Sequence, residues 1–245
     1  ALSGVLEGKI SGTWTAGATD TVQVNVTGYT GNSTANRVWI YCATDGAAHD
    51  NPGNLPGTHY RLSPASGPAI TISEEYTILQ GLWVQLRDPS TYTTYVINSS
   101  AADVTVRDCV VFPGVGGSNG AWRGIANVFV ANNKFFNNVI FGCSDNGIWA
   151  IGGNGMMWNN TIIRCNYGIN SNNTNQTQGI NNLVQESVTT DYFQVDLAGT
   201  ATNVDDDGSG DITGNVAFVS EVSPFDYHLA SSDTVAIDLK LDPSY

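Results

Sequence analysis

The chain contains 245 residues, of which 9 are basic and 22 acidic, so its net charge at pH 7 is −13. Hydrophobic residues make up 41% of it, with 6 Trp, 10 Tyr and 8 Phe, which is enough apolar side chain for the core of one large domain. An excess of carboxylates repels phosphate groups, so we expect neither a nucleic-acid partner nor docking on an anionic membrane surface. No apolar run approaches the 18 residues that a membrane-spanning helix needs.

The sequence is patterned as short strands separated by turns. Runs of β-branched and aromatic residues alternate with clusters of Gly, Asn, Asp and Pro, which is typical of all-β proteins. No segment of a dozen residues carries apolar side chains at helical spacing. In chain order, the clearest predicted strands are residues 22–26, 38–41, 69–72, 76–79 and 82–84.

From residue 78 onward the pattern repeats in two registers. Four seven-residue segments and a weaker six-residue segment align around polar anchors at spacings of 28, 24, 27 and 22 residues, and these anchors are Gln80, Asp108, Asn132, Asn159 and Asn181. A second register keeps phase with the first through four isoleucines, Ile97, Ile125, Ile148 and Ile169. Such a repeat predicts a solenoid of stacked coils with the isoleucines inside. An Asn at a matched turn tolerates a left-handed backbone and can bond to its equivalent one coil away, which accounts for the 25 Asn.

Three segments resemble the coil repeat of the right-handed parallel β-helix, or pectin-lyase-like, superfamily, and they are Asn132–Phe135, Asn159–Ile163 and Tyr167–Asn170. Residues 214–238 are similar to a tail that follows such helices in bacterial surface and phage-associated proteins. The resemblance implies an all-β fold, a right-handed parallel β-helix. It implies no single function, because this fold carries lyases, hydrolases, adhesins and phage spikes.

The repeat divides the chain into three predicted regions. Residues 1–60 are expected to form an N-terminal cap or loop-rich start, residues 61–185 the coils, and residues 186–245 a non-repeating tail that covers the last coil. An open end of a parallel stack leaves strand edges unpaired. An incompletely capped end therefore gives an alternative role in self-association, as a trimer or a filament.

The inward isoleucines predict the outer face of their sheet. Their neighbours along each strand point outward, and a row of Gly124, Gly147 and Gly168 would leave the floor of a groove. An indole stacks on a sugar ring, while Asp, Asn and Arg bond its hydroxyl groups. We therefore predict glycan contacts from six residues, which are Trp122, Arg123, Asp145, Trp149, Tyr167 and Asn170. The alternative is that these aromatic residues cover the edge of the core or a subunit contact.

Residues that would support catalysis are sparse. The resemblance implies a Lys or Arg base for a lyase, or several close aspartates for a hydrolase, and paired carboxyls work about 5–10 Å apart. The basic residues of the coils are scattered, and they are Arg107, Arg123, Lys134 and Arg164. The aspartates of the coils are isolated, and they are Asp103, Asp108 and Asp145. The sequence favours a non-catalytic protein, with a polysaccharide lyase or glycoside hydrolase as the alternative.

The sharpest local motif runs from Asn203 to Asp211 and reads Asn-Val-Asp-Asp-Asp-Gly-Ser-Gly-Asp. Oxygen-bearing side chains at positions 1, 3, 5 and 9 with Gly at position 6 resemble the first part of a calcium loop. The predicted Ca²⁺ ligands are Asn203, Asp205, Asp207 and Asp211. Position 12 is Gly214 instead of a bidentate Glu, so we expect weak affinity unless a distant carboxylate contributes. The alternative is a solvated acidic turn.

The four cysteines form no CxxC pair, which argues against a zinc or redox site. We expect free buried thiols, with a Cys143–Cys165 disulfide as the alternative. Few Lys and abundant Thr, Ser, Asn and Gly suit an extracellular, cell-surface or virion-surface protein. The function we expect is that of a glycan-binding adhesin or a structural spike subunit, with a polysaccharide or cell-surface glycan as partner.

Overall fold

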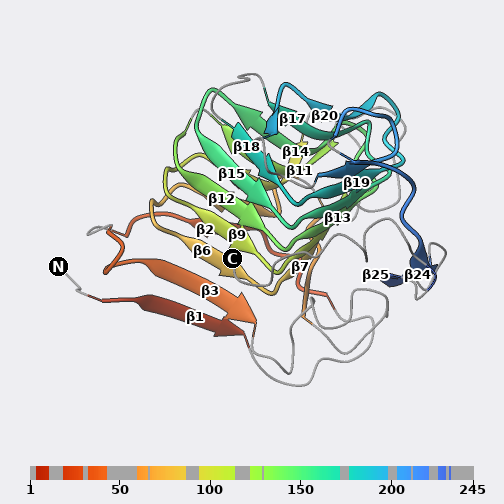
Figure 1. Cartoon of the computed structure of the whole chain (residues 1–245). Helices are drawn as coiled ribbons and strands as arrows, with labels where there is room; N and C mark the ends of the chain where they lie inside the picture. The colour runs from red at the N-terminus through yellow and green to blue at the C-terminus, as the bar shows by residue number, and fades with distance from the viewer. Residues whose placement is uncertain are drawn as a thin grey trace.

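The computed structural model describes residues 4–10, 19–29, 33–42, 60–65, 67–86, 94–113, 122–128, 130–171, 177–197, 203–210, 212–220, 226–229 and 232. The regular structure of these residues consists of short strands without helices (Figure 1). None of the described ranges contains a helix long and apolar enough to cross a membrane.

Most strands belong to three sheets, in which all neighbours pair in parallel. Sheet 1 contains, in spatial order, β1 (Leu6–Ile10), β3 (Val38–Cys42), β6 (Ile78–Gln80), β9 (Thr105–Arg107), β12 (Asn133–Phe136), β15 (Gly155–Trp158), β18 (Thr177–Ile180) and β21 (Asp196–Leu197). Sheet 2 contains β4 (Arg61–Leu62), β7 (Trp83–Gln85), β10 (Val110–Phe112), β13 (Val139–Phe141), β16 (Thr161–Ile163), β19 (Leu183–Gln185), β22 (Val204–Asp205) and β23 (Ile212–Thr213). Sheet 3 contains β2 (Val24–Val26), β5 (Ile70–Ile72), β8 (Thr94–Ser99), β11 (Trp122–Val128), β14 (Asn146–Ile151), β17 (Tyr167–Ser171) and β20 (Thr190–Phe193).

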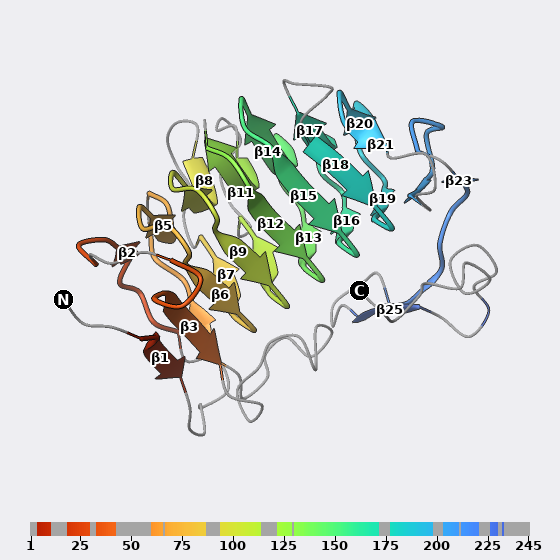
Figure 2. The ribbon, with the colours of Figure 1, turned by 60° about the vertical axis from the view of Figure 1, so that its left-hand side comes forward.

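The chain visits sheet 3, sheet 1 and sheet 2 in turn and then begins the next coil. Strands β8, β9 and β10 form one such coil, and β11, β12 and β13 pair beside them in the next. Figure 2 shows sheet 1 as a continuous series from β1 to β21, with the antiparallel hairpin of β24 (Phe218–Ser220) and β25 (Asp226–Leu229) outside the stack. The predicted all-β parallel solenoid is confirmed. The sheets of the solenoid also include strands that precede residue 61 and strands that follow residue 185 in the sequence, outside the range predicted for the coils.

The core lies between the three sheets. Ile97, Ile125, Ile148 and Ile169 occupy equivalent positions of neighbouring strands in sheet 3, and none is exposed to solvent. Equivalent rows of sheets 1 and 2 face them, and each row alternates with residues that point outward. The inward register that the sequence predicted is therefore confirmed.

The turn from sheet 1 to sheet 2 has two residues in five successive coils. Its first residue has a positive φ, which is 54° at Asn137, 55° at Asn159 and 51° at Asn181. Asn tolerates this left-handed conformation better than most residues, as predicted. The alignment of two coils was wrong, because Gly81, and not Gln80, is the equivalent of Asp108, and Asn137, and not Asn132, is the equivalent of Asn159. Asn132 lies instead at the corner that precedes β12.

The second residue of the same turn forms the asparagine ladder. The side-chain amides of Asn138, Asn160 and Asn182 each donate to the side-chain oxygen of the next ladder residue, at 3.0, 2.9 and 3.1 Å, and the row ends at Asn203. All four side chains are buried. The expectation that one Asn supplies both the left-handed turn and the ladder was therefore wrong, because the first residue of the turn has the positive φ and the second residue forms the buried row of amides.

Sheet 2 also carries an apolar cluster on its outer face. Trp83, Val110 and Ile163 are buried there, and they pack with Val216 and Phe218 from the region after the last strand of the sheet. Gln185 holds this region in place, because its amide donates to the carbonyl of Val216 and its side-chain oxygen accepts from the Val216 N–H.

Candidate functional site

Aromatic and charged side chains gather on the outer face of sheet 3. The Arg123 guanidinium carbon lies 3.4 Å from the centre of the Trp149 ring, and its Nε donates to Asp145 at 2.7 Å. The ring of Tyr95 lies nearly parallel to that of Trp149, with centres 5.8 Å apart, and its hydroxyl is 3.5 Å from an Arg123 amino group. A cation held against an indole face by a carboxylate is a rigid arrangement. The structure thus joins three of the six predicted glycan residues.

The other predicted glycan residues have different surroundings. Asn170 follows Trp149 in the same outward row and is half-buried, and its buried side-chain oxygen has no hydrogen-bond partner within the described part of the chain. Tyr167 lies one coil from the cluster, and its ring centre is 5.8 Å from that of Phe193, which is 42% exposed. Trp122 is only 5% exposed. Its ring therefore covers the interior, as in the alternative given above, and offers little surface to a ligand.

The row of glycines does not form a groove floor. Gly124, Gly147 and Gly168 are buried, and a Cβ at Gly147 would lie 2.5 Å from a methyl group of Ile162 in the core. A Cβ at Gly124 would lie 2.6 Å from Ile140. These glycines let sheet 3 approach sheet 2 closely, and the expectation that they line an outer groove was wrong.

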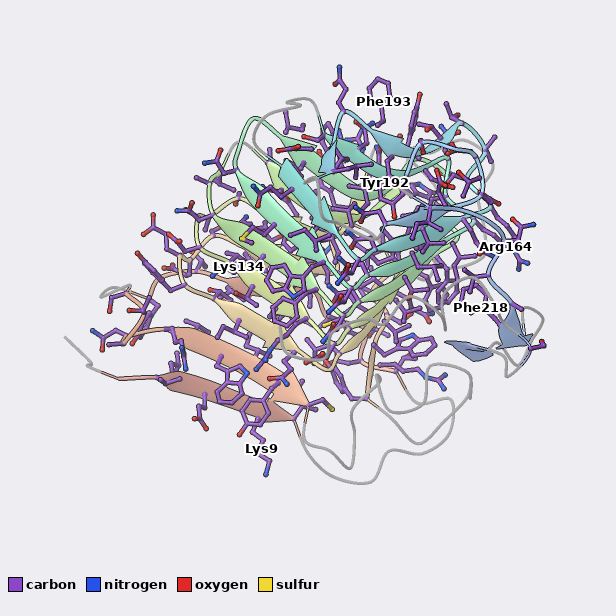
Figure 3. All side chains as sticks on the ribbon, viewed as in Figure 1. Lys9, Lys134, Arg164, Tyr192, Phe193 and Phe218 are labelled. Carbon is purple, nitrogen blue, oxygen red and sulfur yellow. The ribbon has the colours of Figure 1, made fainter. Side chains whose placement is uncertain are left out.

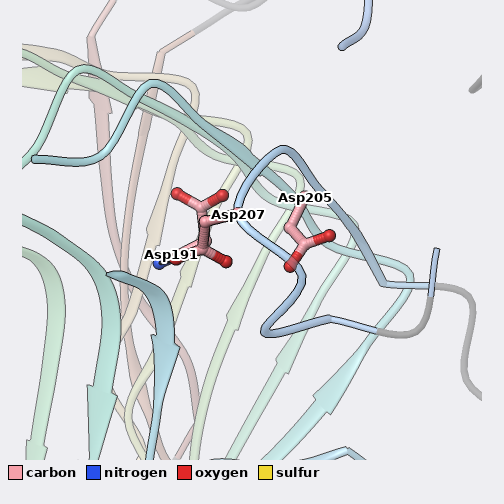
Figure 4. Close-up of side chains that lie close together, drawn as sticks. All are labelled: Asp191, Asp205 and Asp207. Atoms are coloured by element: carbon pink, nitrogen blue, oxygen red, sulfur yellow. Dashed lines mark hydrogen bonds between the residues drawn. The ribbon is translucent and has the colours of Figure 1, made fainter. Parts of the chain in front are cut away.

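Three aspartates near the C-terminal end of the stack converge on one point (Figure 4). Asp191 lies on β20, Asp205 on β22 and Asp207 in the turn that follows, and each supplies a carboxylate oxygen within 4.8 Å of the other two. Asp191 and Asp205 are fully buried, and Oδ1 of each has no hydrogen-bond partner among the residues that the structure describes. Calcium ligands lie 2.3–2.6 Å from the ion, so opposite ligands are about 4.6–5.2 Å apart. This triad can therefore hold a metal ion.

The hydrogen bonds of the triad fix its geometry. Asp207 accepts the N–H of Asp191 at 2.9 Å and that of Ser209 at 2.8 Å, and Asp205 accepts the N–H of Gly210. Asp191 accepts the N–H of Asp206 at 3.1 Å. Each carboxylate is thus held by the backbone of a neighbouring segment, which joins β20 to the turn after β22.

The surroundings of these carboxyls move their pKa values in opposite directions. Burial, followed by the nearby Asp206 carboxyl, raises the pKa of Asp191 to about 7, and burial raises the pKa of Asp205. Burial also opposes ionisation of Asp207, but hydrogen bonds from Ser209 and the Asp191 backbone outweigh it and lower the pKa of Asp207 to about 2. Burying an unpaired carboxylate costs free energy, and a cation bound between these carboxylates would offset that cost.

The metal ligands predicted from the local motif are retained in part. Asp205 and Asp207 belong to the triad, whereas the Asn203 side chain accepts from Asn182 and donates to the Gly179 carbonyl as the end of the asparagine ladder. Asp211 lies outside the described residues. The motif could not reveal Asp191, because that residue is distant in sequence. The repeat could have revealed Asp191, because Tyr192 pairs with Ile169 and continues the inward row, and Asp191 directly precedes Tyr192 on β20.

The isolated aspartates of the coils lie at different corners. Asp103 precedes β9, Asp108 lies between sheets 1 and 2, and Asp145 precedes β14. Asp108 accepts hydrogen bonds from Gln80 and Asn137, and Asp145 forms an ion pair with Arg123, so these two aspartates have structural partners. They form no carboxylate pair. None of the four cysteines forms a disulfide and all four are buried, as expected, and burial together with the neighbouring Cys165 thiol raises the pKa of Cys143.

Comparison of the chain with protein-family models, with curated proteins and with solved structures finds no significant match. The relation to the pectin-lyase-like superfamily therefore stays a resemblance of the repeat. The architecture is that of a parallel β-solenoid.

Proposed function

We propose that this chain is a non-catalytic glycan-binding protein of an extracellular, cell or virion surface, and that the outer face of sheet 3 binds the glycan. The observation that carries the proposal is the cluster of Tyr95, Arg123, Asp145 and Trp149. Its ring surfaces suit the apolar face of a sugar, and its charged groups suit the hydroxyls. Self-association through an end of the stack is part of the same proposal.

An array of neutral and acidic oligosaccharides, followed by calorimetry with the strongest binder, tests the proposal. We expect Trp149→Ala to weaken binding about tenfold or more, because a buried aromatic contact typically carries much of the binding energy. Trp158→Ala is the matched control, because Trp158 stacks on Phe136 on the outer face of sheet 1. Unchanged binding in Trp149→Ala, or no binding by the parent chain, would overturn the proposal.

The alternative function, a polysaccharide lyase or glycoside hydrolase, is measured with the same oligosaccharides. A lyase releases unsaturated products that absorb in the ultraviolet, and a hydrolase releases reducing ends. We expect neither, because the described carboxylates that lie close together are those of the Asp191 triad, two of which are buried. If the purified chain forms either product, the chain is an enzyme and the proposal of a non-catalytic protein is wrong.

The metal proposed for the triad is calcium. Three carboxylates give a strongly anionic, all-oxygen site, and calcium accepts such ligands in irregular geometry with water in the remaining positions. Asp191 is the distant carboxylate that the local motif lacked. The site would join β20 to the turn after β22, so its role is to stabilise the end of the solenoid.

Thermal unfolding with and without calcium tests this assignment. We expect millimolar calcium to raise the Tm of the parent chain, because a ligand that binds only the folded state stabilises it. In Asp205→Asn the increase should be lost, while Asp196→Asn, which removes a charge outside the triad, should keep it. An equal increase in Asp205→Asn, or no increase in the parent chain, would contradict calcium binding at the triad.

A further inference from the structure

The strand β1 ends sheet 1 on the N-terminal side and leaves one of its edges open. Among the described residues β1 pairs with β3 alone, and Figure 2 shows it as the outermost strand of the sheet. Leu6 donates its N–H to the carbonyl of Arg37 at 2.8 Å, on the side of β3. Alternate residues of a strand direct their backbone groups to the same side, so Glu7 and Lys9 direct theirs to the open edge. Such an edge is a template for a further strand.

The side chains of β1 divide between the two faces of sheet 1. Ile10 packs against the core, and Leu6, which has the same orientation, is 50% exposed at the end of the stack. Glu7 and Lys9 are exposed on the outer face, and neither has an ion pair with any residue that the structure describes. The Glu7 carboxylate accepts a hydrogen bond from the Tyr41 hydroxyl at 3.4 Å. Figure 3 shows the Lys9 side chain directed away from the coils.

The sequence of β1, Leu-Glu-Gly-Lys-Ile, is complementary to itself in the antiparallel direction. When Gly8 lies opposite Gly8 of a second copy, Glu7 lies opposite Lys9 and Leu6 opposite Ile10, each twice because of the two-fold symmetry. Glu7 and Lys9 are then the residues that exchange backbone hydrogen bonds, and they are the ones whose backbone groups face the open edge. Opposite charges and apolar side chains that face each other across two strands stabilise the pair.

The charges of β1 select this register over its neighbours. A shift by two residues keeps the backbone hydrogen bonds but places Glu7 opposite Glu7 in one direction and Lys9 opposite Lys9 in the other. Like charges directly opposite each other are destabilising. A shift by one residue places outward side chains opposite inward ones. Only the register centred on Gly8 therefore combines the backbone bonds with matched charges.

We propose that two copies of this chain pair through β1 in antiparallel orientation, so that sheet 1 continues from one copy into the other. This inference rests on the self-association included in the proposed function, and it specifies the surface and the partner, which is a second copy. A two-fold pair uses the same edge of both copies and therefore closes as a dimer. At the other end of sheet 1, β21 has two residues against the five of β1, so head-to-tail stacking into a filament would pair less of the strand.

Sedimentation equilibrium of the full chain between about 1 and 200 µM measures the association. We expect a monomer–dimer equilibrium without larger species. Lys9→Glu and Glu7→Lys should each weaken the dimer about tenfold or more, because two attractions across the pair become two repulsions. Lys134→Glu makes the same change of charge at an exposed lysine of β12 and should leave the dimer unchanged. Circular dichroism checks that the variants keep the fold of the parent chain.

A mixture of the two charge variants provides a gain of association that misfolding could not produce. Equal amounts of Lys9→Glu and Glu7→Lys should form a mixed dimer, because each strand carries the charges that complement the other. The double variant Glu7→Lys/Lys9→Glu should dimerise by itself for the same reason. A monomeric parent chain, oligomers larger than a dimer, or equal dimerisation of the parent chain and both single variants would overturn the proposal.

The sheet 3 variant distinguishes failure of this proposal from failure of glycan binding. We expect Trp149→Ala to dimerise like the parent chain and Lys9→Glu to bind the glycan like the parent chain. If no glycan binds but the charge variants change dimerisation as expected, glycan binding by sheet 3 is wrong and the β1 dimer stands. If the glycan binds to a chain that stays monomeric, the β1 dimer is wrong and glycan binding stands.

Discussion

The side-chain amide of Asn160 donates to the side-chain oxygen of Asn182, 2.9 Å away in the next coil, and both residues are buried. The same Asn160 amide also donates to the carbonyl of Phe135 at 2.9 Å, and the N–H of Asn138 donates to the Asn160 oxygen at 3.2 Å. One side chain thus satisfies groups from three coils. The ladder keeps the two-residue turn in phase along the stack.

Removal of one member of the ladder should destabilise the whole solenoid. We expect Asn160→Ala to lower the free energy of unfolding by about 2–4 kcal/mol, because it leaves several buried polar groups without partners. Asn159→Gly changes the adjacent residue, whose φ of 55° suits glycine, and should change stability by less than about 0.5 kcal/mol. Urea unfolding followed by circular dichroism measures both. Equal losses in the two variants would contradict a special role for the ladder.

The glycines of sheet 3 should tolerate no side chain. We expect Gly147→Ala to reduce the free energy of unfolding by about 1–3 kcal/mol, because its Cβ would lie 2.5 Å from Ile162 and 2.8 Å from the carbonyl oxygen of Gly168. Gly8→Ala is the control, since its Cβ would meet Ile40 at an ordinary 3.5 Å. If Gly147→Ala is as stable as the parent chain, the glycine faces open space after all.

The stability of the calcium-free chain should depend on Asp191 and pH. Its pKa is about 7 in the folded chain, against about 3.9 for an unfolded aspartate. The folded state therefore holds this proton more tightly, so the stabilisation is complete below about pH 4 and is lost as pH rises to about 7. In Asp191→Asn this loss should be absent, and urea midpoints at pH 5, 6, 7 and 8 compare the two chains. A parallel pH dependence in both chains would exclude Asp191 as the source.

The region after β23 should detach when Gln185 is shortened. Gln185→Ala removes both hydrogen bonds to the Val216 backbone, and we expect faster hydrogen exchange at residues 214–218 with the coils still protected. Gln178→Ala is the control, because Gln178 is an exposed glutamine on the outer face of sheet 1. Exchange at residues 214–218 that matches the parent chain would mean that the apolar contacts of Val216 and Phe218 suffice.

The sequence by itself determined the solenoid and its inward register. Alternation along a strand and the backbone preference of Asn in a tight turn are local properties, so Ile97, Ile125, Ile148 and Ile169 and the turn at Asn159 were predictable. Only the tertiary structure decided which residue of each turn enters the ladder. That choice depends on the side chain that points inward, and the uneven loop before Asn137 hid the correct alignment.

The tertiary structure also decided the character of the outer face of sheet 3 and of the acidic turn. Trp149 and Arg123 were predictable as neighbours from their register, but the burial of Gly147 depends on how closely sheet 3 packs on sheet 2. Asp205 and Asp207 were visible as a motif, whereas Asp191 joins them only because β20 lies beside the turn of the following coil. Contacts between coils follow from stacking, and a single sequence records stacking only where its loops keep constant length.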